Sequence, residues 1–145
     1  MGRLLYRHTQ IGTLILFSLA IGALIVIGAG GRMAGPLLAA LLLTAFLFST
    51  LTVEVDEENL AFFFGPGFLR RSLPLKSIRS FRVVRNPWWY GWGIHLTPHG
   101  WLYNVSGWEA VELELEDGRR LRIGTDAPQR LAQALREALG MEEEP

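Results

Sequence analysis

The residues best suited to chemistry are six cations gathered in one stretch of 16 residues: Arg70, Arg71, Lys76, Arg79, Arg82 and Arg85. No acidic residue occurs between Asn59 and Trp108. Such a run can bind an anionic lipid surface, where each cation contributes ~1 kcal/mol. It can equally be a solvated strand face whose arginines pair with Glu54, Asp56 or the glutamates of 112–116, and such surface pairs stabilise by only ~0–1 kcal/mol. The sequence leaves both interpretations open.

A tryptophan-rich segment follows the cations. All five tryptophans lie between residues 88 and 108, and Trp88, Trp89, Tyr90 and Trp92 stand close together. Aromatic side chains of this kind fill the cores of barrels. Tryptophan and tyrosine also favour the interface of a bilayer. These four residues are therefore candidates for lipid or partner binding alongside the cations, or for packing within the domain.

No residue set in the sequence points to catalysis or to a metal. His95 and His99 have the spacing of metal ligands on a helix, but Pro98 forbids that helix and no third ligand is near in sequence. Ser106 lacks the G-x-S-x-G setting of a nucleophile. The chain has no cysteine, which excludes disulfides and thiol catalysis. We expect a non-enzymatic protein without cofactor or metal.

The distribution of charge argues against nucleic-acid binding. All 14 acidic residues lie at or after Glu54, whereas three of the 14 basic residues precede it. The part of the chain beyond Val53 therefore carries 11 basic and 14 acidic residues, a net charge of −3. A nucleic-acid-binding domain is normally basic.

The elements that would position these residues begin with an apolar segment, residues 11–53, whose only charge is Arg32. Arg32 divides this segment into two uncharged runs, 11–31 and 33–53. As a helix, each run would span roughly 30 Å, the thickness of a hydrocarbon core. The sequence predicts a transmembrane helical hairpin with helices at about 11–29 and 33–51. Residues 1–10 form a basic flank, and the lysine and arginine bias favours both termini in the cytoplasm.

Small residues recur at four-residue spacing within this segment, as in Ser18 with Gly22 and Gly35 with Ala39. Such spacing lets the backbones of two helices approach closely. The pattern is compatible with packing of the two helices inside the hairpin. It is also compatible with an interface to a second copy or to another subunit.

Residues 52–140 have the two-residue hydrophobic period of strands, interrupted by closely spaced turn signals. The pattern predicts a small antiparallel barrel or sandwich of about seven strands. A helix capped by Asp126 and ended by Gly140 would plug one open end. Residues 141–145 are expected to form a frayed acidic tail.

The strand pair joined near Gly118 has a predictable register. A three-residue loop, 116–118, with Gly118 left-handed in a G1 bulge, sets Leu113 opposite Leu121 in the core. The same register sets Glu112 opposite Arg122 as a pair on the exposed face. A two-residue loop would instead set Arg122 opposite Leu113 and place a charge in the core. We predict the three-residue loop.

Several segments together resemble the bacterial pleckstrin-homology-like (PH-like) membrane proteins: 90–94, 97–107, 111–113 and 122–126. The resemblance implies two nearly orthogonal antiparallel sheets with seven strands and a C-terminal helix at one corner. It implies residence in the bacterial inner membrane and no catalytic residues. Eukaryotic relatives of the fold often bind phosphoinositides near the first hairpin, but the turn here, 56–59, is acidic and would repel phosphate.

The predicted fold class is thus an α+β membrane protein: a transmembrane hairpin followed by a PH-like seven-stranded antiparallel barrel capped by a helix. The predicted location is the inner membrane, multi-pass, with the domain in the cytoplasm. The predicted function is a membrane-anchored interaction or scaffold module that binds a protein partner or self-associates. The alternative is an anionic-lipid-binding domain that uses the basic stretch 70–85 and the tryptophan-rich loop 88–92.

Overall fold

The computed structural model describes residues 3–91, 93–105 and 107–144, and within these ranges it contains two sheets and three α-helices. The first sheet is antiparallel throughout and has the strand order β1-β2-β3-β4. Its strands are β1 (Leu4–Ile11), β2 (Thr50–Asp56), β3 (Asn59–Phe64) and β4 (Phe68–Pro74).

The second sheet has the order β5-β8-β9-β7-β6. Its strands are β5 (Ile78–Arg85), β6 (Gly93–Thr97), β7 (Gly100–Asn104), β8 (Glu109–Leu115) and β9 (Arg120–Gly124). Strands β7 and β9 run parallel, and the other neighbours are antiparallel. The predicted seven-stranded, wholly antiparallel barrel is therefore wrong, because the described residues form nine strands and one parallel pair.

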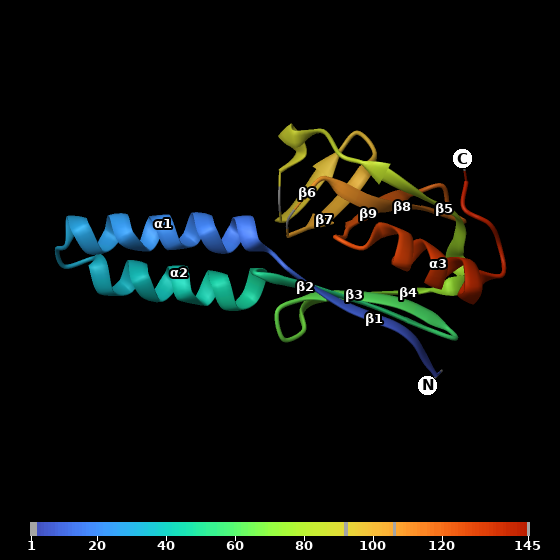
Figure 1. Ribbon diagram of the computed structural model, residues 1–145, viewed down its shortest axis with the longest axis horizontal. Coiled ribbons are helices and arrows are strands. Elements are labelled where there is room, and N and C mark those ends of the chain that lie inside the picture. The colour runs from blue at the N-terminus through green and yellow to red at the C-terminus, as the bar shows by residue number, and fades with distance from the viewer. Residues whose placement is uncertain (1–2, 92, 106, 145) are drawn as a thin grey trace.

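The core lies between the two sheets and is closed at one end by α3 (Pro128–Leu139), as Figure 1 shows. Phe62, Phe81, Leu131 and Leu135 are each at most 1% exposed. Gly140 ends α3 in the left-handed conformation (φ 66°), and its N–H donates to the carbonyl of Arg136. The predicted end of this helix is confirmed.

The start of α3 differs from the prediction that Asp126 caps it. Ala127 occupies the cap position, and no side chain caps the helix. The N–H of Ala127 donates to Thr125 Oγ1, while Asp126 Oδ1 lies 2.5 Å from His8 Nε2. Asp126 therefore links β1 to the start of α3 instead of capping the helix.

The register of β8 and β9 is confirmed. Leu113 pairs with Leu121, Val111 with Ile123 and Glu112 with Arg122. Gly118 has φ 88°, and its N–H donates to the carbonyl of Leu115. Alanine at this position would have to adopt the same left-handed backbone, which glycine tolerates best.

The two apolar helices, α1 (Thr13–Ala29) and α2 (Ala34–Phe48), extend away from the sheets as a hairpin (Figure 1). They have 17 and 15 residues, which corresponds to roughly 25 and 22 Å of helix, less than a hydrocarbon core of ~30 Å. None of the helices in the described part of the chain is both long and apolar enough to cross a membrane. The predicted transmembrane hairpin and the multi-pass inner-membrane location are therefore wrong.

The physical reason is that strands occupy the ends of the apolar segment. Ile11 belongs to β1 and pairs with Thr50 of β2, so residues 50–53 are extended and not helical. The N–H of Gly12 donates to the carbonyl of Ser49 and closes the base of the hairpin. The hairpin α1–α2 is thus inserted between two paired strands of the first sheet.

The C-terminal segment, which was expected to be frayed, makes defined contacts up to Glu144. The N–H of Glu144 donates to the carbonyl of Phe81, and the Glu143 carboxylate accepts from the N–H of Val83. Arg136 forms an ion pair with Glu142 at 3.1 Å. This acidic segment therefore lies along β5, an edge strand of the second sheet.

Candidate binding surfaces

The six cations of the basic stretch 70–85, which the sequence suggested as one candidate surface, lie at separate places in the structure. Arg70 and Arg71 lie on β4 and line one pocket together. Their pocket, the β4–β7 groove, has a volume of about 360 Å³. It is lined by Leu69, Arg70, Arg71, Ile94, Trp101 and Tyr103. Trp101, Tyr103, Leu69 and Ile94 were not candidates from the sequence.

Both arginines of the groove have defined contacts. Nη1 of Arg71 donates to the hydroxyl of Tyr103 at 2.9 Å, which joins β4 of the first sheet to β7 of the second. The Arg70 guanidinium lies 4.9 Å from the centre of the Phe63 ring and 3.5 Å from a Glu54 oxygen. Arg70 is therefore held in place, whereas Arg71 forms no ion pair among the residues that the structure describes.

Leu69, on the wall of the groove, has φ 54° and is the sole non-glycine residue with positive φ in the described ranges. A bulky residue in the left-handed region is uncommon and costs free energy. The register of β3 and β4 shifts between Phe62 and Phe64, directly across from this segment. The irregularity places Leu69 in the same groove as Arg71, two residues further along the strand.

Arg79 and Arg82 are engaged by glutamates of β8. Arg79 lies 3.4 Å from Glu114 and 3.7 Å from Glu116. Arg82 lies 3.1 Å from Glu112. For these two arginines the interpretation as a paired strand face is the better supported one.

Glu112 and Arg122 form a buried ion pair at 2.8 Å, with side chains only 5% and 6% exposed. The sequence predicted that both would face solvent. Asn86 Oδ1 also accepts from Arg122 Nη1 at 2.8 Å. Burial alone would raise the pKa of Glu112, but the hydrogen bond from Arg122 and the charges of Arg122 and Arg82 outweigh it and hold the pKa below its ordinary value of 4.5.

A loss of stability at acid pH follows from the lowered pKa of Glu112. A carboxyl group whose pKa is lower in the folded state contributes stability above its unfolded pKa of 4.5, and this contribution is lost as pH falls through the folded pKa. We expect the unfolding free energy to fall below about pH 4.5, and Glu112→Gln to weaken this dependence. Urea unfolding between pH 3 and 6 measures it; an unchanged slope in Glu112→Gln would contradict the assignment.

Lys76 and Arg85 lie apart from the groove. Lys76 borders a pocket with Glu57 and Glu58. Arg85 borders another pocket, of about 420 Å³, with Trp88 and Trp108. Neither cation forms an ion pair within the described ranges 3–91, 93–105 and 107–144.

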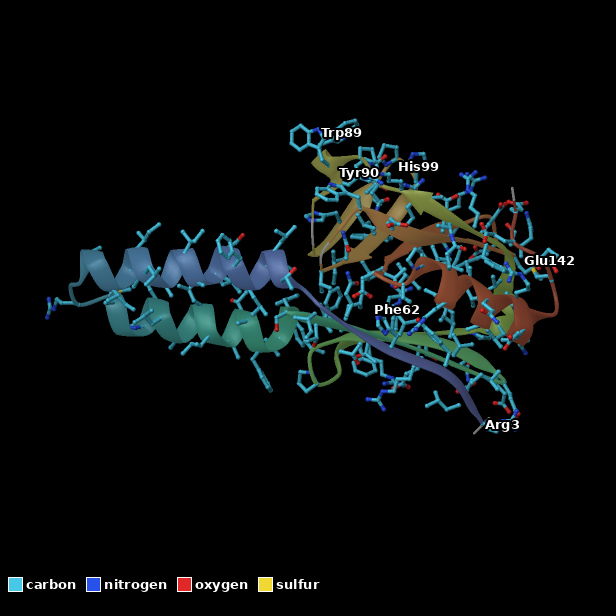
Figure 2. The ribbon with its side chains drawn as sticks, in the orientation of Figure 1. Arg3, Phe62, Trp89, Tyr90, His99 and Glu142 are labelled. Carbon is cyan, nitrogen blue, oxygen red and sulfur yellow. The ribbon has the colours of Figure 1, made fainter. Side chains whose placement is uncertain are left out.

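The tryptophan-rich loop stands out from the second sheet. Trp88, Trp89 and Tyr90 form a short 3-10 turn, and Trp88 and Trp89 are 75% and 67% exposed. Figure 2 shows the labelled Trp89 at the outer limit of the domain, while Phe62 lies in its interior. These two tryptophans are surface residues, whereas Trp92 lies outside the described residues.

The largest apolar surface belongs to the hairpin. Neither α1 nor α2 has a buried residue, and the two helices contact chiefly each other. Twelve large apolar side chains between residues 13 and 48 are 37–71% exposed, among them Leu24 at 69% and Leu42 at 71%. Arg32, at the tip, is the single charge in the hairpin.

In the part of the chain that the structure describes, no group of three His, Asp or Glu side chains could hold a metal ion. His99 faces Tyr90, with ring centres 6.2 Å apart. No protein-family model and no curated protein matches this chain, so the resemblance to PH-like proteins stays a prediction.

Proposed function

We propose that this chain is a non-enzymatic interaction module that self-associates through the apolar hairpin α1–α2. The observation that carries the proposal is the exposure of the hairpin on all sides. A helix that is apolar all round is normally buried, yet α1 and α2 bury no residue within one copy. A second copy supplies a surface of the same kind.

The exposed area is large enough for a stable interface. If each of the twelve side chains presents ~80 Å² to solvent, the hairpin offers roughly 1,000 Å² of apolar surface. A standard interface buries ~800 Å² on each partner. At ~25 cal/mol per Å² the gross gain on covering the whole of this surface is about 25 kcal/mol, which is to be set against the ~4–15 kcal/mol cost of each association.

The chemistry of the hairpin favours copies of itself as the occupant. A surface without charge, Arg32 excepted, offers nothing that would select a partner by electrostatic complementarity. Packing needs only another apolar helix pair, and each copy brings one. Gly28 and Gly35 have no atom within 4 Å of where a Cβ would lie, so close approach of a neighbouring backbone is sterically open there.

Self-association would make the chain a scaffold. The hairpins would gather at the centre, and each copy would present its two-sheet domain outward. The alternative function, binding of anionic lipid by the basic stretch, draws less support because Arg79 and Arg82 are paired with glutamates and the other four cations lie in three separate pockets.

Cysteine crosslinking tests the proposal, since the natural chain has no cysteine. Leu24→Cys and Leu42→Cys are made as separate single-cysteine variants. We expect each of them to give covalent dimers with a flexible bis-maleimide in detergent-free buffer. Arg130→Cys, an exposed position on α3, is the control that should stay monomeric on a denaturing gel. Equal yields at all three positions, or no product at Leu24 and Leu42, would refute association through the hairpin.

A further inference from the structure

We infer that the β4–β7 groove binds an extended acidic peptide segment that carries an apolar side chain. This inference does not depend on the hairpin, because the groove is formed by β4, β6 and β7. Three features carry it: an arginine without a carboxylate partner, an apolar wall beside that arginine, and strand edges that border the groove.

The first feature is the charge of Arg71. Its guanidinium donates to the Tyr103 hydroxyl and forms no ion pair in the described part of the chain. Arginine presents further donors in a planar fork that matches a carboxylate in a bidentate geometry. The neighbouring Arg70 is already paired with Glu54, so Arg71 is the cation that an anionic group in the groove would meet. The groove is therefore suited to an anionic group.

The second feature is the apolar wall. Leu69 and Trp101 are 45% and 47% exposed, and Ile94 completes the lining. A volume of about 360 Å³ lies within the ~300–1,000 Å³ of ordinary ligand pockets. Leu69 and Arg71 are two residues apart on β4 and both line the groove, so an extended ligand with an acidic and an apolar side chain two residues apart, on one face, matches them.

The third feature is the position of the groove between two sheet edges. β4 is the last strand of the first sheet, and β6 is the last strand of the second. An edge strand presents backbone N–H and C=O groups that an extended peptide can pair with. A lipid chain or free phosphate cannot make that ladder, which favours a peptide as the ligand.

The chain itself places an acidic segment against a strand edge, through one backbone hydrogen bond and one side-chain hydrogen bond. At the other edge of the second sheet, the acidic C-terminal segment lies along β5, where Glu144 donates its N–H to Phe81 and the Glu143 carboxylate accepts from Val83. An acidic segment thus already lies against one edge of this sheet. The edge at β6 is the equivalent position for a segment from another protein.

Fluorescence polarisation with a labelled peptide tests the inference on the full chain. The probe is a six-residue peptide with glutamate at positions 1 and 5, valine at position 3 and serine elsewhere, which places glutamate and valine on one face of the extended chain. Its control has lysine in place of each glutamate. We expect saturable binding of the glutamate peptide only. Because a charge-assisted hydrogen bond contributes ~1.5–3 kcal/mol, Arg71→Gln should weaken the affinity about tenfold or more. Arg85→Gln, at an exposed arginine of another pocket, should change it less than twofold.

Two further measurements separate the possible outcomes. Methylating alternate backbone nitrogens of the peptide should abolish binding if the peptide pairs with a strand edge, and Leu69→Asn, which tolerates a left-handed backbone, should weaken binding without lowering the melting temperature. Absence of binding at millimolar peptide, equal affinity of Arg71→Gln, or equal binding of the lysine peptide would overturn the inference. So would binding of phosphate or anionic vesicles, but not of the peptide.

Discussion

Glu112→Ala is expected to lower the free energy of unfolding by about 3–5 kcal/mol, because it leaves a buried charge without its partner. Arg122 is 5% exposed, and its guanidinium would keep only the hydrogen bond to Asn86. Arg82 would lose the same carboxylate. Urea unfolding followed by circular dichroism measures the change.

Glu114→Ala is the matched control for Glu112→Ala, since it removes a glutamate two residues along the same strand. Glu114 pairs with Arg79 and Arg120 at 3.4 and 3.7 Å, but these arginines are about half exposed. Surface pairs of this kind contribute ~0–1 kcal/mol. Equal losses in the two variants would show that the Glu112–Arg122 pair is solvated in solution, contrary to its buried position here.

Replacing Leu24 and Leu42 together by aspartate is expected to convert the associated chain into a monomer. Both side chains are about 70% exposed within one copy, so the substitutions leave the packing of the chain on itself largely intact. In an associated hairpin they would bury two carboxylates without partners, which costs several kcal/mol each. Sedimentation equilibrium across a range of concentrations measures the change in mass.

The control for this variant carries aspartate at exposed apolar residues outside the hairpin. Leu96 and Trp88 are 70% and 75% exposed, on β6 and on the tryptophan-rich loop. Leu96→Asp with Trp88→Asp should leave the mass unchanged. If the control pair dissociated the protein and the hairpin pair did not, the association surface would lie on the domain.

The sequence predicted those elements whose signals are local. The register of β8 and β9 followed from the side-chain period and the glycine of the turn, and Gly140 marked the end of α3. Strand β1 was missed because it contains polar residues such as Arg7 and His8. They were interpreted as the basic flank of an apolar helix. Only pairing with β2, more than 40 residues away, makes them a strand.

The length of the apolar helices was misjudged for a similar reason. Hydrophobicity alone does not distinguish a helix end from a buried strand, and Leu51 and Val53 belong to the core of the first sheet. The missed strand β1 also fixes the base of the hairpin, since Ile11 pairs with Thr50. Tertiary pairing therefore decides where α1 begins and where α2 ends.

The candidate sites could be predicted only in part. The composition of the stretch 70–85 identified Arg71, but its partner Tyr103 and the neighbouring Trp101 come from β7, which is distant in sequence. The alternation of β8 and β9 predicted Glu112 facing Arg122, yet gave no sign that both are buried. Residues that meet across sheets leave no local pattern.

The central claim is that the exposed hairpin is covered by another copy of the same chain. Sedimentation equilibrium of the unmodified chain in detergent-free buffer, with and without added lipid vesicles, tests it most directly. We expect a defined mass of two or more copies that is unchanged by vesicles. A monomer at every concentration, or a chain that is kept dispersed only by detergent or vesicles, would contradict the claim.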